Sequence, residues 1–204
     1  MPPHALGPSD ALLVVDVQRD FCAGGALAVP DGDAVVPVLN DWIAQARRGG
    51  AQVVFSRDWH PPDHCSFRSQ GGPWPPHCIQ GTEGAAFHPK LQVPQDAWIV
   101  SKGMDRDREQ YSALDCTDLA QRLKGLGVRR LWVGGLALDY CVRASALDAA
   151  GAGFEVHLLT SATRPVDPQR ASQVLAQMEA AGVRLEDAAE TVSLRRGTSR
   201  GASG

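Results

Sequence analysis

The residue with the clearest potential for chemistry is Cys141, which follows an apolar run at 131–133 and the pair Gly134-Gly135. The run predicts the end of a buried strand that the glycines break, and from Cys141 the pattern becomes helical as far as Gly151. A thiol in the first turn of a helix lies beside unpaired backbone N–H groups and the positive end of the helix dipole. This setting lowers the pKa of a thiol, and the same N–H groups can stabilise an oxyanion. Two interpretations stay open: a cysteine nucleophile, or a small buried side chain that packs a helix on a sheet.

Asp16 and Lys102 are candidates to flank that thiol, because each stands at the end of a short predicted strand, at 11–15 and 98–101. A carboxylate at the end of a buried strand needs a partner that offsets its desolvation, and an ammonium supplies one. Asp16 could take the thiol proton and later deliver it to a leaving group, while Lys102 adds positive potential. The alternative is a structural salt bridge, which either residue taken alone would fit equally well.

Asp58 and His60, with His64 and His77 downstream, have the composition of a metal site. One carboxylate and two imidazoles leave positions open on a divalent ion for water or substrate, and zinc, iron(II) and manganese(II) all accept such donors. The same segment could be a hydrogen-bonded turn. A structural zinc site that includes Cys65 and Cys78 is a further alternative, although no paired CxxC spacing occurs.

Aromatic side chains lie near these candidates, in polar or glycine-rich segments. They are Phe21, Trp74, Tyr111 and Tyr140. Aromatic residues belong to the core more often than to a pocket, but their placement here suits a pocket for a flat ring.

The elements that must position these side chains follow from hydrophobic patterning. Strands are predicted at 11–15, 52–56, 98–101, 131–133 and 154–160. Helices are predicted at 35–46 with Asp33 as cap, at 119–126, at 141–151 and at 168–181. Strands that alternate with helices predict a three-layer α/β/α fold with a mostly parallel central sheet. In such sheets the active site lies beyond the carboxyl ends of the strands, which is where the pattern puts the candidate residues.

Composition bounds the function. The chain has 204 residues with a net charge of −3, which gives no electrostatic argument for nucleic acid or an anionic membrane. No apolar run approaches a membrane span, and residues 1–4 do not begin a signal peptide. Five scattered cysteines predict reduced thiols in a cytoplasm. We expect one catalytic domain over 1–204, with disordered ends at 1–9 and 195–204, and a homo-oligomer is left open.

Six segments together resemble the nicotinamidase/pyrazinamidase branch of the isochorismatase-like cysteine hydrolases. They are 14–21 (VVDVQRDF), 57–67 (RDWHPPDHCSF), 72–78 (GPWPPHC), 101–103 (SKG), 111–112 (YS) and 134–143 (GGLALDYCVR). The resemblance runs from about residue 12 to 181. It implies a triad of Asp16, Lys102 and Cys141, and metal ligands Asp58, His60 and His77. It further implies an oxyanion hole from the backbone N–H groups of Ala137 and Cys141, a cis peptide before Ala137, and ring contacts from Phe21, Trp74 and Tyr111.

Two positions qualify the resemblance. Leu138 stands where many relatives carry Thr, and His64 matches a family histidine whose role as ligand, water partner or scaffold the sequence leaves open. Relatives that cleave isochorismate lack the metal segment, so its presence favours the nicotinamidase branch. The expected function is therefore hydrolysis of nicotinamide, and of pyrazinamide, to the acid and ammonia through a thioester, in NAD salvage. The ring nitrogen is expected to bind the metal. The alternatives are another amidase or ureido hydrolase of the superfamily, or a non-catalytic zinc-stabilised binding module.

Overall fold

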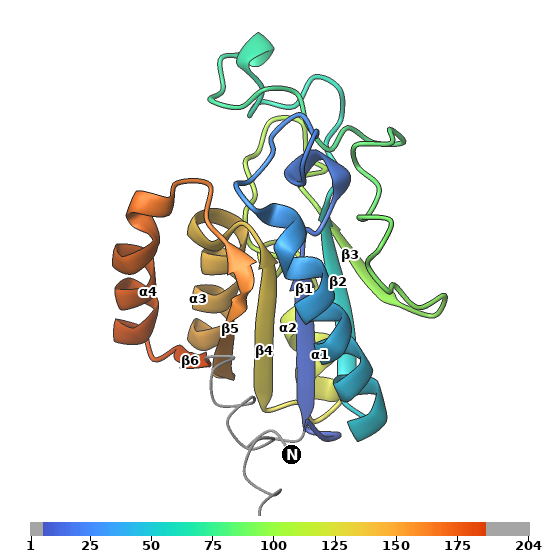
Figure 1. The fold of residues 1–204 in the computed structure, drawn as a ribbon, viewed down its shortest axis with the longest axis vertical. Coiled ribbons are helices and arrows are strands. Elements are labelled where there is room, and N and C mark those ends of the chain that lie inside the picture. Colours follow the sequence, from blue (N-terminus) through green and yellow to red (C-terminus); the bar gives the residue numbers. More distant parts are fainter. Residues whose placement is uncertain (1–5, 187–204) are drawn as a thin grey trace, which may run out of the picture.

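The central element of the part of the chain that the structure describes is a six-stranded sheet whose strands are all parallel, in the order β3-β2-β1-β4-β5-β6. A computed structural model describes residues 6–186. The strands are β1 (Asp10–Val15), β2 (Gln52–Asp58), β3 (Trp98–Lys102), β4 (Arg130–Leu136), β5 (Glu155–Arg164) and β6 (Arg184–Glu186). The residues of β1 are all buried, as expected for a strand covered on both faces (Figure 1).

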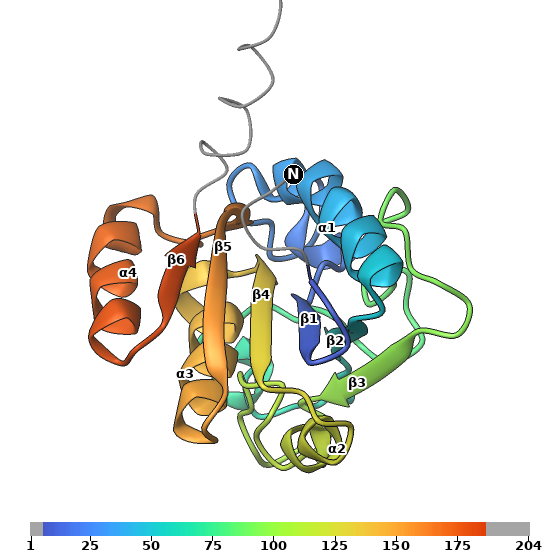
Figure 2. The same cartoon turned by 90° about the horizontal axis from the view of Figure 1, so that it is seen from below.

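Helices cover both faces of the sheet, which confirms the predicted three-layer α/β/α fold. They are α1 (Val35–Gly49), α2 (Leu119–Gly125), α3 (Arg143–Gly151) and α4 (Ala171–Ala180). Figure 2 shows α1 on one side of the sheet and α2 and α3 on the other. Two apolar cores result. One packs α1 against Leu12, Val14 and Phe55, and the second packs the other three helices against Leu13, Val54 and Leu158.

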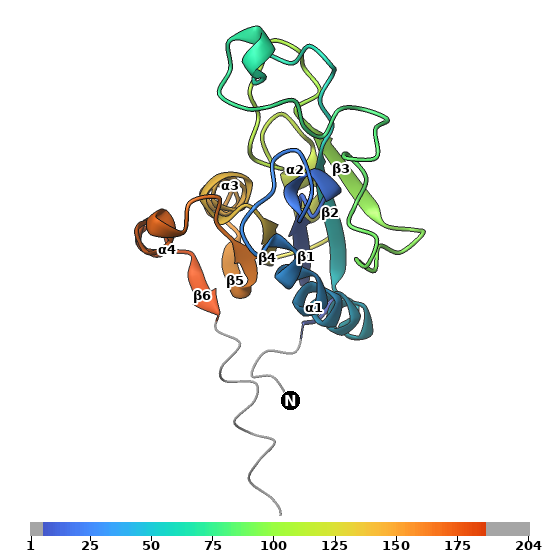
Figure 3. The same ribbon diagram turned by 45° about the horizontal axis from the view of Figure 1, so that its top comes forward.

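The sheet order places a topological switch point between β1 and β4. Ligands of doubly wound sheets bind beyond the carboxyl ends of the strands at such a point. The segments that connect β2 to β3 and β3 to α2 carry one 3₁₀ turn (Arg68–Gln70) and otherwise no helix or strand. The second of these segments, and the first as far as about residue 87, lie together beyond this end of the sheet, as Figures 1 and 3 show. The rest of the first segment runs back beside α1 to the start of β3. Between the two segments the N–H of Cys65 donates to the carbonyl of Arg106 at 2.8 Å.

Several predicted elements differ in detail. Gly134 and Gly135 do not break β4, since both pair with β1, opposite Val14 and Val15. At Gly135 the backbone has φ 126°, and a Cβ there would lie 2.0 Å from the carbonyl oxygen of Val15. Glycine is thus what lets these two strands approach at the switch point.

The helix after β4 also begins differently, as a π-helical turn at Leu138–Val142 that contains Cys141. Asp33 does not cap α1. It lies inside a short 3₁₀ turn, Gly32–Ala34, and binds other partners. The last predicted helix opens with a 3₁₀ turn at Pro168–Arg170, another 3₁₀ turn forms at Arg19–Phe21, and β6 has no counterpart in the prediction.

The ends of the chain fall largely outside the described residues. This holds for the expected disordered segment 195–204 and for 1–5 of the expected segment 1–9. Residues 6–9 differ from the expectation, because Leu6 is buried in the core and the carbonyl of Ser9 accepts from Arg129 at 2.8 Å. Between residues 6 and 186, no helix has both the length and the apolar character to cross a membrane.

Candidate active site

Cys141 lies in the π-helical turn just beyond the carboxyl end of β4, and it is buried. Its Sγ is 3.3 Å from Nζ of Lys102, which donates to it. Burial raises the pKa of the Cys141 thiol well above its usual value, the ammonium of Lys102 opposes this, and Asp16 and Asp58 add to the rise. The expectation of a lowered thiol pKa was therefore wrong, because a helix terminus counts for less than removal from water beside two carboxylates.

Asp16 and Lys102 meet at the carboxyl ends of β1 and β3. Nζ of Lys102 is 2.8 Å from Oδ2 of Asp16, and it also forms an ion pair with Oδ1 of Asp58. Both side chains of the first pair are fully buried. Asp16 has a left-handed backbone with φ 47°, and its Oδ1 accepts from Oγ of Ser56 at 2.7 Å. The turn after β1 thus directs the carboxylate toward the neighbouring strands.

The ammonium of Lys102 forms ion pairs with two carboxyl groups, and the balance of their charges sets the pKa values in this group. Burial disfavours the cation, but the charges of Asp16 and Asp58 outweigh it and hold the pKa of Lys102 well above its usual value. Burial also raises the pKa of Asp16. The charge of Lys102 offsets only part of this rise, and the charge of Asp58 adds to it. An Asp16 carboxylate beside a neutral thiol, with oxygen and sulfur within 4.8 Å, is poised to accept a proton from it.

A second group, Asp58, His60 and His77, has the geometry of a metal site. One potential ligand atom from each residue lies within 4.8 Å of the others, and all three residues are buried. Nδ1 of His60 is 2.9 Å from the carbonyl of Gly103, and Nδ1 of His77 is 2.8 Å from that of Pro75. Each ring therefore donates from Nδ1 to a carbonyl and presents an Nε2 lone pair, as metal-ligating histidines do. The residues present fit a divalent ion with N and O donors.

His64 differs from these two histidines, because both of its ring nitrogens are engaged by the protein. Nδ1 is 2.7 Å from Oγ of Ser66, and Nε2 is 3.0 Å from the carbonyl of Arg108. The ring packs 4.2 Å from that of His60, measured between centroids. This arrangement suits a side chain that supports His60 and joins the two long loops rather than a ligand.

The structure also shows a residue that the sequence analysis did not single out, Gln18. Its side-chain Oε1 accepts from the N–H of Asp58 at 2.7 Å, and its Nε2 donates to the carbonyl of Asp58 at 2.8 Å. Nε2 also donates to the carbonyl of Ala85 at 2.9 Å, and Gln18 is fully buried. Gln18 therefore holds the backbone of Asp58 from both sides. No sequence signal identifies it beyond its place two residues after Asp16.

The cleft beside these groups encloses about 430 Å³, including its open mouth, within the range of small-molecule sites. Its walls are largely aromatic: Nε1 of Trp74 donates to the hydroxyl of Tyr111 at 3.1 Å, and the Trp74 and Tyr140 rings meet edge to face. The expected ring-binding residues all line it, together with Ala137 and Cys141. The other lining residues are Leu27, Asp58, His60, His77, Glu109, Gln110, Tyr140 and Val166.

Four wall residues, Leu27, Glu109, Gln110 and Val166, were missed because they lie in segments without a recognisable motif. Val166 is held by the buried carboxylate of Asp139, which accepts from the N–H groups of Val166 at 2.8 Å and Asp167 at 3.0 Å. Asp139 belongs to the same turn as Cys141, so the nucleophile turn and this wall of the cleft are tied together.

The remaining expectations concern the backbone and the other thiols. A cis peptide bond joins Leu136 to Ala137, as the resemblance implies. All five cysteines are free. Among the described residues, neither Cys65 nor Cys78 belongs to a cluster that could hold a metal, which leaves the structural zinc alternative without support.

Comparison with known proteins identifies the family of this chain. The isochorismatase domain model matches residues 10–190. The chain belongs to the isochorismatase domain family. Among relatives in this family, the nicotinamidase of Escherichia coli is 40% identical over 201 residues, with 87% of this chain and 94% of that protein covered.

Two solved structures are also similar. The pyrazinamidase of Pyrococcus horikoshii in complex with zinc has a TM-score of 0.86 and 48% identity, covering 88% of this chain and 99% of that one. PnC1 from L. infantum in complex with nicotinate has a TM-score of 0.84 and 37% identity, covering 91% and 96%.

Proposed function

We propose that this chain is a metal-dependent cysteine amidase that hydrolyses nicotinamide to nicotinate and ammonia, and that it also accepts pyrazinamide. The similarity to nicotinamidases and to a pyrazinamidase supports this substrate class. Such a product would enter NAD salvage, and five free thiols suit the reducing cytoplasm expected for that role.

One observation carries the proposal. Asp58 belongs both to the group with His60 and His77 and to the group with Asp16 and Cys141. A site for a divalent ion and a nucleophile therefore share a carboxylate at one end of one aromatic cleft. A substrate that fits must present a donor atom to the ion and an electrophilic carbon to sulfur, on a flat ring. A pyridine carboxamide has this form.

The reaction follows from the side chains of the triad. Asp16 accepts the proton of Cys141 as Sγ attacks the carboxamide carbon, and Lys102 stabilises the charge in this buried group. The N–H groups of Ala137 and Cys141 are assigned to the oxyanion. The C–N bond then breaks, and the nitrogen leaves as ammonia with the proton from Asp16. Water attacks the resulting thioester, gives its proton to Asp16 and releases the acid, after which the proton returns to Cys141.

The three ligands, Asp58, His60 and His77, would hold the ion. When bound, it supplies an electrophilic position for the ring nitrogen and so aligns the carboxamide with Sγ. Phe21, Trp74 and Tyr111 enclose the ring. Such positioning contributes to rate through effective molarity, because the reacting atoms start close together.

The test compares nicotinamide with benzamide, which keeps the ring and carboxamide but lacks the ring nitrogen. Ammonia release is measured for the wild type, for chelated protein, and for His77→Ala. We expect kcat/KM for nicotinamide to collapse in the last two, and benzamide to be a poor substrate of all three. Alkylation of Cys141 by a small reagent, detected by mass spectrometry, should persist and so shows that the triad remains assembled. Undiminished turnover by the chelated protein would overturn the metal-dependent mechanism.

A further inference from the structure

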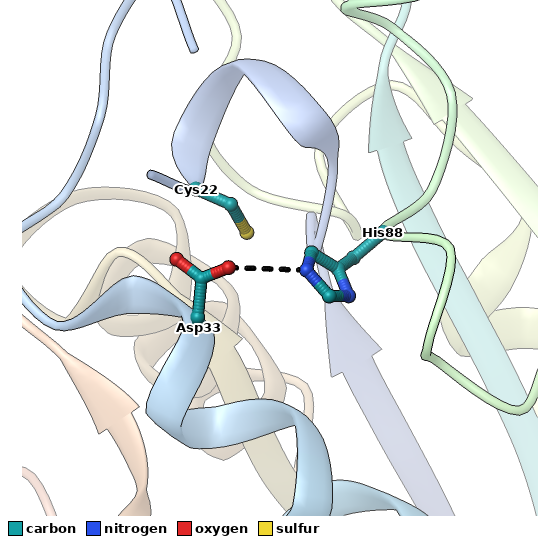
Figure 4. Close-up of side chains that lie close together, drawn as sticks. All are labelled: Cys22, Asp33 and His88. Atoms are coloured by element: carbon teal, nitrogen blue, oxygen red, sulfur yellow. Dashed lines mark hydrogen bonds and ion pairs between the residues drawn. The ribbon is translucent and has the colours of Figure 1, made fainter. Parts of the chain in front are cut away.

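A second cluster of metal-binding side chains lies outside the active site, formed by Cys22, Asp33 and His88. Cys22 directly follows the turn Arg19–Phe21, Asp33 lies in the turn Gly32–Ala34, and His88 lies in the long segment between β2 and β3. One potential ligand atom from each residue lies within 4.8 Å of the others. Figure 4 shows the thiol, the carboxylate and the imidazole directed toward a common point. None of the three lines the substrate cleft.

The spacing of these atoms is close to what a tetrahedral ion requires. Nε2 of His88 is 3.1 Å from Oδ1 of Asp33. Two ligand atoms at zinc bond lengths stand about 3.3 Å apart for nitrogen and oxygen, and about 3.6 Å apart when one of them is sulfur. The nitrogen–oxygen edge is therefore nearly in place, and Sγ of Cys22 has only a short distance to move.

Cys22 packs in the apolar core beside α1, and its thiol has no role beyond this packing without a cation. It is 2% exposed, and among the described residues it makes no hydrogen bond through Sγ. Burial raises its pKa to about 12, and the negative charge of Asp33 contributes. A thiolate beside a carboxylate is unfavourable unless a positive charge lies between them. These surroundings also exclude a second nucleophile, because the neutral, enclosed thiol is neither activated nor open to a substrate.

The surroundings of the other two ligands decide how an ion would enter. Oδ2 of Asp33 accepts from the N–H of Ala23 at 2.8 Å, which orients the carboxylate. The side chains of His88 and Asp33 are 11% and 46% exposed, so the cluster opens to solvent on the Asp33 side and leaves room for a water as fourth ligand. Nδ1 of His88 accepts from the N–H of Lys90 at 3.2 Å, so Nε2 carries the proton in the metal-free protein. Metal binding would move that proton to Nδ1 and break this long hydrogen bond.

We infer that Cys22, Asp33 and His88 form a second site for a thiophilic divalent cation of the zinc class, separate from the site at Asp58. Its chemistry is Cys, Asp and His ligation with one open position, and the Cys22 proton is released to solvent on binding. Because Cys22 is bonded to Phe21, the ion fastens one wall of the substrate cleft to the start of α1 and to the loop that carries His88. Its role is to tether three segments, not to take part in hydrolysis.

The probe is zinc itself, counted per chain after metal-free protein is loaded and freed of unbound ion. We expect two ions on the wild type, one on Cys22→Ser, one on His77→Ala and none on the double variant. Cys65→Ser, which removes a half-exposed thiol outside the cluster, is the matched control and should hold two. If only the active-site proposal fails, the wild type holds one ion and Cys22→Ser none. If Cys22→Ser holds as many ions as the wild type, the second site does not exist.

Cobalt(II) gives an independent readout, because a thiolate ligand adds a charge-transfer absorption that nitrogen and oxygen ligands do not. We expect this band in the wild type, in His77→Ala and in Cys78→Ser, and its loss in Cys22→Ser and in His88→Gln. The wild-type spectrum needs no variant to fold, and His88→Gln covers the case in which the buried Cys22→Ser change prevents folding. A wild-type cobalt spectrum without a thiolate band, or a band that persists in both cluster variants, would overturn the assignment.

Discussion

Gln18 offers the sharpest test of how this fold builds its metal site, because it touches neither the proposed substrate nor the ion. Its side chain makes three buried hydrogen bonds of 2.7–2.9 Å, two of them to the backbone of Asp58. The substitution Gln18→Leu keeps a side chain of similar size and removes every one of these bonds. It leaves the N–H and carbonyl of Asp58 and the carbonyl of Ala85 without their partner, in a place that water does not reach.

The magnitude follows from these three groups. A buried polar group left without a partner costs about 1–3 kcal/mol, so three such groups together would cost about 3–9 kcal/mol. Part of this cost is offset, because the substitution also removes the Gln amide from the interior and adds an apolar side chain there. We therefore expect a loss of about 3 kcal/mol in the free energy of unfolding, at the low end of that sum. Because the Asp58 backbone then moves, metal affinity should fall about 10–100-fold, as when support of a ligand is removed.

Two measurements separate the effects: urea unfolding of the metal-free protein, and competition for zinc against a chelator at a temperature where both proteins are folded. Gln80→Leu is the matched control. Nε2 of Gln80 donates to the carbonyl of Trp59, the residue after Asp58, at 2.8 Å, but Gln80 is exposed. Water can replace that bond, so the control should stay within about 0.5 kcal/mol of the wild type.

The reasoning fails if Gln18→Leu is as stable as Gln80→Leu and binds zinc like the wild type. A stability loss with unchanged affinity would refute only the second step, namely that the Gln18 contacts set the position of the Asp58 carboxylate. Because the Cys22 cluster is also expected to hold zinc, the competition is best run in the Cys22→Ser background, which leaves one site to titrate.

Three further predictions concern the triad and the far end of the sheet. Cys141→Ala should abolish ammonia release while metal content is retained, and mass spectrometry should find a trapped acyl group on Cys141 of the wild type and on no other cysteine. Asp16→Asn keeps the shape of the side chain but cannot take the thiol proton, so kcat should fall by about two to four orders of magnitude, and a variant with most of its activity would refute the role. Asp10 is buried at the start of β1, where burial alone would raise its pKa, but hydrogen bonds from Arg130, Gly7 and Trp132 outweigh this and lower it. Its contribution to stability is therefore complete above the usual carboxyl pKa of about 3.9 and disappears as pH falls through the lower folded value. Asp10→Asn should cost about 2 kcal/mol at neutral pH in urea unfolding, and this deficit should shrink in acid; a constant deficit would show that the charge of Asp10 contributes nothing.

The architecture could be predicted from the sequence because strands buried on both faces are visible as short apolar runs. The run that precedes Asp16 became β1, while β2 and β3 extend to include Asp58 and Lys102 themselves. Once those strands are parallel, their carboxyl ends share one edge of the sheet, and the side chains that follow must converge there. Residue type and position in the chain therefore determined which groups meet.

Other features depended on contacts between distant segments, which local patterns do not encode. Asp33 has the residue type of a helix cap, yet its oxygens bind Ala23 and His88, which lie 10 and 55 positions away in the chain. β4 continues through Gly134 and Gly135, since pairing with β1 prevails over the local tendency of glycine to end a strand.

The pKa of Cys141 and the different roles of His64 and His77 were decided by tertiary structure alone. His64 and His77 are both histidines in one loop, and only their hydrogen-bond partners show that His64 has no free nitrogen whereas His77 has one. The sequence put Cys141 near a helix start, which favours a thiolate. The fold buried it beside two carboxylates and one ammonium, and the pKa rose instead. A pKa depends on desolvation and on charges a few ångströms away, and both arise only when β1, β2, β3 and β4 come together.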